Sequence, residues 1–296
     1  LRFSAIAGLL FAAIISLVLT MNITGPIRKL GRGTRSLISG EFKTRVSIQN
    51  RDELGKLSRD FNILAKTLDK NSESQKQWLA DISHELRTPI AILKSELEAV
   101  EDGIREFDKE TLQSLTHEVK RINNLVNDLY ELTLADLGAM KYQMREMNIG
   151  SCLKEVIESY RDRLESSEIE IKELIDTEGA FLGDSYRLEQ LFTNLIENTL
   201  RYTDSPGKLE IQLKENKEDI LITFSDSEPG VDPDVMDKVF DRFFREELSR
   251  SREKGGAGLG LAICHEIVEA HSGKIKATKS EHGGLSIEIS LPKGDT

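Results

Sequence analysis

Cysteine is nearly absent from this chain, and its scarcity limits the chemistry that the protein can perform. Cys152 and Cys264 are the only cysteines among 296 residues, and they do not form a CxxC pair. A disulfide framework or a zinc site needs ligands at defined spacings, which this sequence lacks. We therefore expect two buried free thiols in a protein of a reducing compartment.

The chain also has less positive than negative charge. It has 40 Lys and Arg residues and 51 Asp and Glu residues, and the formal net charge at pH 7 is -11. Phosphate backbones repel such a chain, so we predict no direct binding to nucleic acid. Hydrophobic residues make up 39% and charged residues 31% of the sequence. This mixture is typical of folded domains with surface-rich helices, and the length favours two or more folded units.

One long apolar run lies near the start of the chain. The segment from Phe3 to Met21 has no charged side chain, and it is long enough to cross a hydrocarbon core of about 30 Å. A signal peptide has a shorter apolar region, of about 7–15 residues, so we predict a transmembrane helix over residues 1–21. The flanking basic residues are Arg2 before the run and Arg28, Lys29, Arg32 and Arg35 after it. The positive-inside rule then places the chain after Met21 in the cytoplasm. Because the sequence starts at Leu1 and not at Met, we interpret it as a fragment.

Two amphipathic segments follow within residues 22–70. Their apolar residues recur every three or four positions, at Ile23, Ile27, Leu30 and Leu37 and then at Leu54, Leu57, Phe61, Leu64 and Leu68. This spacing predicts two short helices with coiled-coil-like stripes. Pro26 suits the entry of the first helix, and a polar connector over residues 40–51 separates the two. Two ordinary surface helices would show the same spacing.

A longer helical pattern covers residues 71–140. One apolar stripe ends at Asp102 and Gly103, and a second stripe ends near Gly138. A helical hairpin with one apolar stripe on each helix leaves its hydrophobic face uncovered. Two copies would bury that face as a four-helix bundle, so we predict a homodimer.

From residue 146 to residue 296 the pattern alternates between helices and strands. We expect helices near residues 151–164, 186–202, 232–240 and 259–270. We expect strands at residues 169–175, 208–213, 219–224, 274–278 and 285–291. Helices on one face of a mixed sheet make an α+β sandwich.

A histidine in the hairpin has the context of a nucleophile. His84 lies two residues from both Ile82 and Leu86, which is about 200° around a helix, so it should point away from the core. A neutral imidazole is a good nucleophile near pH 7, and Glu85 can accept its proton. Taken alone, His84 could equally be an exposed histidine on a charged helix. Thr88 follows one turn later, where its hydroxyl could hold a water or simply pack near Pro89.

Two asparagines predict a site for a metal–phosphate complex. Asn194 and Asn198 are four residues apart and share one face of a predicted helix. Asparagine is a poor helix former, so two of them in a helix interior suggest a use. Their side-chain carbonyls are hard ligands suited to Mg²⁺ on a triphosphate, and Arg201 can reach the phosphates.

Two further elements fit the same ligand. Asp226 ends an apolar strand, where its carboxylate could accept a hydrogen bond from the amino group of adenine, and Gly230 and Val231 belong to the turn behind it. The glycines at 256, 258 and 260 lead directly into a helix. Glycines allow a close backbone approach, and a helix N-terminus favours phosphate. The lysine of a P-loop is missing, so the site belongs to another class.

Taken together, these motifs resemble the two-component sensor histidine kinases. Ser83 to Pro89 is similar to the H-box, Asn194 to Tyr202 to the N-box and Phe240 to Arg245 to the F-box. Residues 22–70 resemble a HAMP linker, whose signature the Asp52-Glu53-Leu54-Gly55 string matches. The resemblance covers nearly the whole chain after Met21.

The resemblance implies a multidomain kinase of the bacterial inner membrane. Its parts would be a transmembrane helix, a parallel HAMP coiled coil, a dimeric phosphoacceptor hairpin and a GHKL-type ATP-binding domain. His84, with Glu85, would take the γ-phosphoryl group of Mg²⁺-ATP and pass it to an aspartate of a response regulator, and Thr88 would support dephosphorylation of that regulator. The implied nucleotide-binding residues are Asn194, Asn198, Arg201, Tyr202, Asp226, Gly230, Val231, Arg242, Arg245, Gly256, Gly258, Leu259, Gly260 and Leu261.

One residue departs from the family pattern. Glu228 occupies the first glycine position of the turn after Asp226, where a side chain could strain the backbone and its charge could repel phosphate. A non-catalytic pseudokinase scaffold is therefore the alternative function. A third hypothesis is another ATPase of the same nucleotide fold, such as a chaperone or mismatch-repair type, but the hairpin with His84 argues against it.

Overall fold

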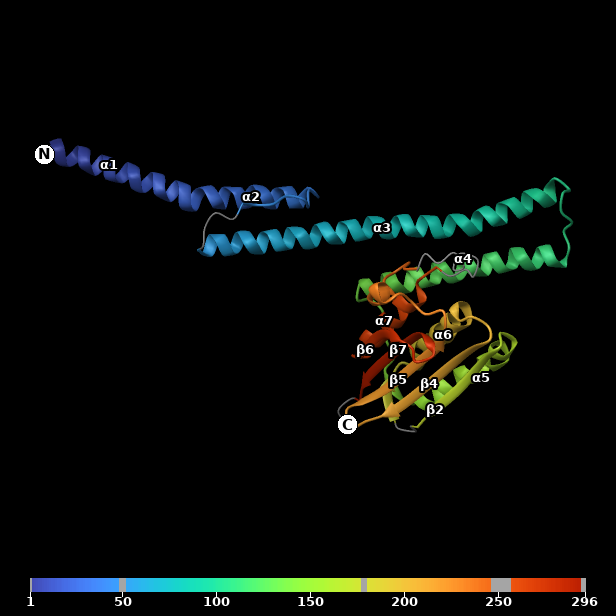
Figure 1. The fold of residues 1–296 in the computed structure, drawn as a ribbon. Helices are drawn as coiled ribbons and strands as arrows, with labels where there is room; N and C mark the ends of the chain where they lie inside the picture. The colour runs from blue at the N-terminus through green and yellow to red at the C-terminus, as the bar shows by residue number, and fades with distance from the viewer. Residues whose placement is uncertain (1, 48–51, 177–179, 246–256, 294–296) are drawn as a thin grey trace. The chain divides into compact units, whose positions relative to one another are not determined.

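The computed structural model describes residues 2–47, 52–176, 180–245 and 257–293. These residues form two compact units, of which the first ends at Ile82 and the second begins at Ser83. Figure 1 shows the helices of the first unit and the helical hairpin and mixed sheet of the second. Each unit is described separately below.

The first unit begins with helix α1 (Arg2–Leu19). A π-helical turn (Thr20–Thr24) joins it to α2 (Gly25–Ile38), which has Pro26 in its first turn. The helix that carries the apolar segment therefore does not end at Met21 but continues without a break into α2. By length and composition alone, this helix is sufficient to cross a membrane.

Helix α2 packs against the start of α3 (Glu53–Glu101). Leu30, Leu37, Val46, Phe61 and Ala65 form the buried cluster between them. The connector that contributes Val46 is fixed by the side chain of Asn62, which binds the backbone N–H and C=O of Val46 at 2.8 Å each.

The start of α3 gives the Asp-Glu-x-Gly string a physical meaning. The Asp52 carboxylate accepts the backbone N–H of Gly55 at 3.0 Å, so it caps a helix terminus that would otherwise leave donors unpaired. The two helices expected on either side of residue 70 are one helix of 49 residues.

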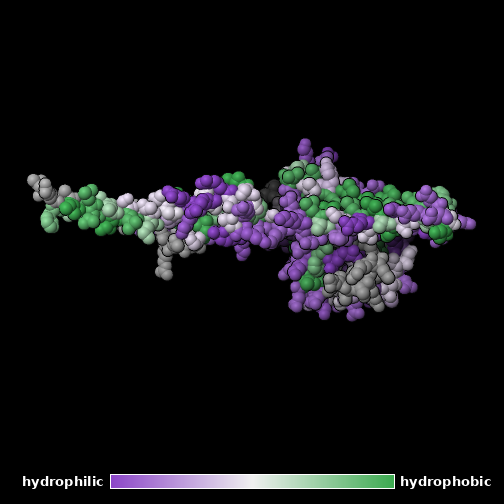
Figure 2. Space-filling model, turned by 90° about the horizontal axis from the view of Figure 1, so that it is seen from above, coloured by the Kyte–Doolittle hydropathy of each residue, from purple (hydrophilic) through white to green (hydrophobic). Residues whose placement is uncertain are grey.

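The second unit contains the helical hairpin. The last part of α3 lies antiparallel to α4 (Lys109–Asp136), which Asp108 caps by accepting the N–H of Thr111 at 2.8 Å. Both helices expose large apolar side chains, among them Ile90, Leu97, Leu112, Val119 and Val126. Figure 2 shows apolar atoms gathered along the hairpin. A contiguous apolar surface of this kind marks an interaction site.

The rest of the second unit is an α+β sandwich, as the sequence predicted. Its sheet has the order β2-β4-β5-β7-β6, with β2 parallel to β4 and the other pairs antiparallel. The strands are β2 (Ile169–Ile175), β4 (Gly207–Glu215), β5 (Asp219–Ser227), β6 (Lys274–Lys279) and β7 (Gly283–Pro292). The helices α5 (Ile149–Ser166), α6 (Ser185–Tyr202) and α7 (Gly260–Ala270) cover one face of the sheet (Figure 1).

Two details differ from the sequence expectation. A small sheet pairs β1 (Arg145–Asn148) with β3 (Ala180–Gly183), and neither strand was predicted. The helix expected over residues 232–240 is only a 3₁₀ segment (Pro233–Lys238). Asp232 caps the start of this segment, and Met236 and Val239 are its buried anchors.

The buried His271 has a backbone partner at each ring nitrogen. His271 accepts the backbone N–H of Asp184 at 3.0 Å, and its other ring nitrogen lies 2.7 Å from the carbonyl of Ile267. Burial lowers the pKa of His271, which favours the neutral ring and a structural role for this residue. Cys152 and Cys264 are free thiols, as expected, but Cys264 is buried whereas Cys152 is half-buried. Burial raises the pKa of Cys152 to about 11.

Gly273 provides a test of the packing between α7 and the sheet. A Cβ atom there would lie 2.6 Å from the carbonyl oxygen of Ser290 and 2.9 Å from Cγ1 of Val268. We expect Gly273→Ala to lower the free energy of unfolding by about 1–3 kcal/mol, because overpacking forces backbone shifts. Thermal unfolding measures the change, and Lys274→Ala at the neighbouring exposed position should stay within about 0.5 kcal/mol of wild type. Equal stability of the two variants would contradict the packing described.

Candidate active site

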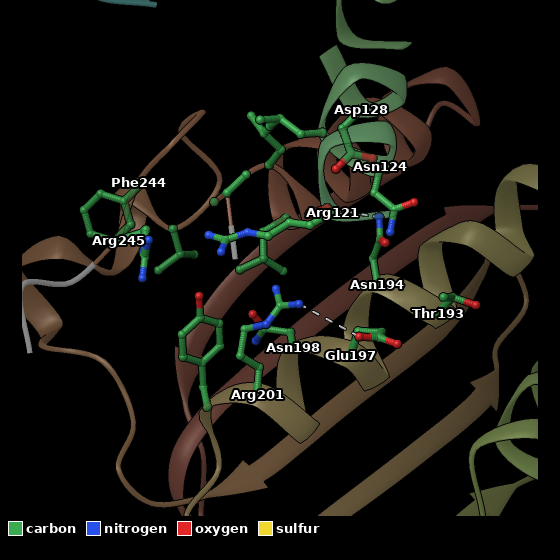
Figure 3. A pocket seen from close by; sticks show the side chains of 18 of the residues that line it. Arg121, Asn124, Asp128, Thr193, Asn194, Glu197, Asn198, Arg201, Phe244 and Arg245 are labelled. Atoms are coloured by element: carbon green, nitrogen blue, oxygen red, sulfur yellow. Dashed lines mark hydrogen bonds and ion pairs between the residues drawn. The ribbon is translucent and has the colours of Figure 1, made fainter. Parts of the chain in front are cut away.

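A cavity of about 1470 Å³ opens in the second unit. Its walls come from α6, from the turn after β5, from the segments on either side of residues 246–256, and from α4 (Figure 3). Twelve of the predicted nucleotide-binding residues line it: Asn194, Asn198, Arg201, Tyr202, Asp226, Gly230, Val231, Arg245, Gly258, Leu259, Gly260 and Leu261. Gly256 lies outside the described residues.

Helix α6 presents its polar face to this cavity because its opposite face is buried. Asp184 caps the helix by accepting the N–H of Arg187 at 3.2 Å, and the buried anchors are Leu188, Leu191, Phe192, Leu195 and Ile196. Asn194 and Asn198 then lie on the exposed face with Arg201 (Figure 3). The Asn194 amide donates to the carbonyl of Gly260 at 3.4 Å, which joins α6 to the start of α7.

Glu197 is a charged residue of this face to which sequence reasoning gave no role. Its carboxylate accepts the Tyr160 hydroxyl at 3.0 Å and Arg163 Nη1 at 2.7 Å, and Arg201 lies 4.0 Å away. Burial opposes ionisation, but the hydrogen bonds from Arg163 and Tyr160 outweigh it and hold the pKa of Glu197 below its usual value. Glu197 therefore remains ionised and holds Arg163 beside the cavity.

Asp226 is buried at the end of β5. It accepts the backbone N–H of Leu285 at 2.6 Å. Burial raises the pKa of this carboxyl to about 7, although the Leu285 N–H acts in the opposite direction. Sequence reasoning missed the glycines that make room for it: a Cβ on Gly284 would collide with Asp226 Oδ1, and Gly283 has φ +95°. The adjacent Gly-Gly pair at the start of β7 was the available signal.

Glu228 does not strain the turn after Asp226, which corrects the expectation from the sequence. Among the described residues, positive φ angles outside glycine occur at Glu168, Phe243 and Ser272, and the positive φ of this turn, +70°, belongs to Gly230. The Glu228 side chain lies against Gly283, where a Cβ atom would come within 2.8 Å of Glu228 Cγ. Glu228 does not line the cavity, so its charge is directed elsewhere.

The two arginines of the F-box-like string separate in the structure. Arg245 lines the cavity. Arg242 does not, because both of its terminal nitrogens bind the carboxylate of Asp136 at 2.6 Å, at the end of α4. The hydrogen bonds to Asp136 raise the pKa of Arg242. A phosphate contact of Arg242, implied by the resemblance, has no support from this position.

Gly258 has a conformational reason to be glycine. Its φ is +68°, and a Cβ atom there would lie 2.8 Å from the carbonyl oxygen of Phe244. Its carbonyl accepts the N–H of Phe243 at 2.9 Å. The backbone just before α7 therefore passes close to the F-box-like string, and this approach brings the N-terminus of α7 to the cavity.

The predicted nucleophile borders the cavity without lining it. His84 is exposed on α3, whereas its neighbour Glu85 and the nearby Pro89 line the cavity. The Thr88 hydroxyl donates to the carbonyl of His84 at 3.3 Å. On the facing helix α4, Arg121, Asn124 and Asp128 also line the cavity (Figure 3). Burial raises the pKa of Asp128 to about 6, and Glu131 adds to this shift.

Comparison with known families agrees with this geometry. The chain matches the HAMP domain over residues 18–70 and the His Kinase A (phospho-acceptor) domain over residues 74–138. It matches the histidine kinase-, DNA gyrase B- and HSP90-like ATPase family over residues 183–295, which implies ATP binding. The chain belongs to the sensor histidine kinases.

Individual relatives point the same way. The chain is 46% identical to the signal transduction histidine-protein kinase BaeS of Escherichia coli K12, over 96% of its own length and 61% of that protein. The structure of histidine kinase AdeS of Acinetobacter baumannii shares 27% identity and a TM-score of 0.62, over 72% of this chain and 98% of AdeS. Histidine kinase ThkA in complex with response regulator TrrA shares the fold, with 24% identity and a TM-score of 0.55, over 76% of this chain and 64% of ThkA. The chain spans about three fifths of BaeS.

The pKa of Asp226 gives a pH test of adenine binding. In the free protein the carboxyl titrates near pH 7, and the ionised form is the better acceptor for the amino group of adenine. We expect the affinity for adenosine to rise by up to about tenfold between pH 6 and pH 8. Adenosine is used because it has no phosphate that titrates in this range. Asp226→Asn should bind weakly with no such pH dependence, and a flat wild-type profile would contradict the role of Asp226.

Proposed function

We propose that the chain is an active, ATP-dependent protein-histidine kinase that phosphorylates its own His84. One observation carries this proposal: Glu85, the residue next to His84, lines the same cavity as Asn194, Asn198 and Arg201. The phosphoacceptor turn and the nucleotide-binding face of α6 thus border one space. A kinase needs this proximity, because bringing the nucleophile to the phosphate supplies much of the rate enhancement.

In this proposal, different residues of the cavity bind different parts of the nucleotide. Asp226 accepts a hydrogen bond from adenine, and the N-terminus of α7 with Gly258 and Gly260 holds phosphate oxygens. Tyr202, Val231, Leu259 and Leu261 complete the walls, and Arg201 and Arg245 supply positive charge. The amide oxygens of Asn194 and Asn198 are the hard ligands that suit Mg²⁺. When bound with ATP, Mg²⁺ would neutralise charge on the phosphates.

The transfer step requires little covalent chemistry from the protein. A nitrogen of the His84 imidazole attacks the γ-phosphorus, and a P–N bond forms while the bond to the β,γ-bridging oxygen breaks. ADP leaves with that oxygen, and Glu85 accepts the imidazole proton. A response regulator would then receive the phosphoryl group on an aspartate. ThkA, which shares this fold, has been crystallised with a response regulator, and this supports a receiver domain as the partner.

The proposal also covers assembly and location. A second copy of the chain would cover the exposed apolar stripe of the hairpin and form a homodimeric four-helix bundle. The N-terminal apolar helix would anchor the dimer in the bacterial inner membrane, with residues after Met21 in the cytoplasm. The pseudokinase alternative rested on Glu228, and that side chain lies against Gly283 and not in the cavity.

Replacing the nucleophile tests the proposal directly. We expect His84→Gln to abolish labelling by γ-labelled ATP while nucleotide affinity stays unchanged, because His84 does not line the cavity. Asn198→Ala is the complementary variant. It should lose Mg²⁺-ATP binding, and therefore labelling, while the protein stays folded. The label should be acid-labile and alkali-stable, as expected for phosphohistidine. Phosphate that remains on His84→Gln would reject the assignment.

Thr88 tests the second activity, dephosphorylation of the regulator. Among the described residues, its hydroxyl makes one hydrogen bond, to the carbonyl of His84 at 3.3 Å, so it can turn to hold a water one helical turn from the histidine. We expect Thr88→Ala to keep autophosphorylation and to slow the decay of phosphorylated regulator by about 10-fold or more. With Thr88→Ser, which keeps the hydroxyl, the phosphorylated regulator should decay as fast as with wild type. Equal decay rates of the phosphorylated regulator with Thr88→Ala and with wild type would contradict this role of Thr88.

A further inference from the structure

The proposed function leaves one wall of the cavity without a role. Arg121, Asn124 and Asp128 are spaced by three and four residues on α4, and all three line the cavity. They belong to the phosphoacceptor hairpin and not to the ATP-binding domain. Figure 3 shows the Arg121 side chain extending from α4 into the cavity, with its guanidinium toward the side that carries Arg245.

The register of the hairpin places Arg121 close to the phosphoacceptor turn. Glu96 Oε1 accepts the Ser114 hydroxyl at 2.8 Å, which pairs the two helices at that level. Antiparallel helices rise equally, by about 1.5 Å per residue. Equal steps from this pair bring Pro89 opposite Arg121, and Glu85 opposite Leu125. Arg121 therefore lies roughly one turn from the level of His84, on the side that faces the nucleotide cavity.

The guanidinium of Arg121 is available for a ligand. Its nearest carboxylate oxygen, Glu118 Oε2, lies 3.8 Å from Nη1, beyond hydrogen-bond distance. Within the described parts of the chain, no hydrogen bond involves the Arg121 side chain. The neighbouring arginines are engaged: Arg163 binds Glu197 and Arg187 binds Glu131, each at 2.7 Å.

We propose that Arg121 contacts the γ-phosphoryl group as it passes from ATP to His84; this inference rests on the function proposed above. In phosphoryl transfer, charge is spread over the equatorial oxygens of the transferring group, and catalysis consists largely of positioning and charge neutralisation. A guanidinium presents a planar fork of donors to such oxygens. Because the hairpin carries Arg121, its contact stabilises the transfer step and not the binding of nucleotide to the ATP-binding domain.

A purely structural role makes a different prediction. If Arg121 served only as an ion-pair partner of Glu118, an i,i+3 pair at 3.8 Å would contribute a few tenths of a kcal/mol to stability and nothing to the rate. The two roles are separated by measuring nucleotide affinity, transfer rate and thermal unfolding on the same variants.

The experiment compares Arg121→Gln, Arg121→Lys and the control Lys109→Gln in the full chain. Lys109 is exposed at the start of α4 and does not line the cavity. The measurements are the rate of His84 labelling at saturating ATP and the Kd of a non-hydrolysable ATP analogue. We expect Arg121→Gln to lower the rate by about 10- to 100-fold and to change the Kd by less than about twofold. Arg121→Lys should recover part of the rate, and Lys109→Gln should match wild type.

The contrary outcomes are distinct. An Arg121→Gln rate equal to that of wild type would overturn this inference alone. So would a loss of rate that tracks a weaker Kd or a lower unfolding temperature and that lysine does not restore. A wild-type chain that carries no phosphate on His84 would overturn the proposed function, and this inference with it.

Discussion

Helix α6 must bury one face against the sheet, and the geometry of the candidate site follows from that requirement. Leu188, Leu191, Leu195 and their neighbours are fully or almost fully buried, and burial of each such side chain contributes about 1.5–3 kcal/mol. No polar contact of the site approaches the sum of these contributions. The direction in which Asn194 and Asn198 point is therefore fixed by hydrophobic packing on the opposite side of the helix, before any ligand binds.

Features that depend on local periodicity could be predicted from the sequence. The amphipathic spacing of α6 placed both asparagines on one face, and alternating apolar residues identified the five strands of the main sheet. Glycines before α7 predicted a close backbone approach, which Gly258 makes. Asp226 was identified because it ends an apolar strand, where a carboxylate could accept a hydrogen bond from the amino group of adenine.

Features that depend on long-range contacts could not be predicted. Nothing near Glu228 in the sequence indicates that its side chain lies against Gly283, 55 residues further along. Arg242 sits in a motif whose other arginine lines the cavity, yet it pairs with Asp136 on α4. Arg121 shows the same limit: its spacing predicts a polar helix face, but only the packing of α4 near α6 makes that face a wall of the site.

The contacts that join α4 to the ATP-binding domain are both apolar and polar, since Leu125 and Leu132 of α4 belong to the same buried cluster as Ile263 of α7. Glu131 accepts Arg187 Nη1 at 2.7 Å and Gln190 Nε2 at 2.6 Å, and Asp136 binds Arg242. The charged pair of Arg187 and Glu131 is itself mostly buried, and burial of an apolar side chain such as Leu132 contributes about 1.5–3 kcal/mol. The hairpin and the ATP-binding domain are therefore held together by apolar packing, and the charged pairs fix the orientation of α4.

The hydrogen bond from Leu285 to Asp226 has a consequence for the order of binding. The carboxylate is immobilised by the backbone of β7 when the domain folds, so its conformational entropy is already lost before a nucleotide arrives. The arginines on the phosphate side have longer side chains with more rotatable bonds, so fixing them on a phosphate costs more conformational entropy. The adenine end of the cavity is thus a rigid template, and this asymmetry favours docking of the base first, with the phosphates gathered afterwards.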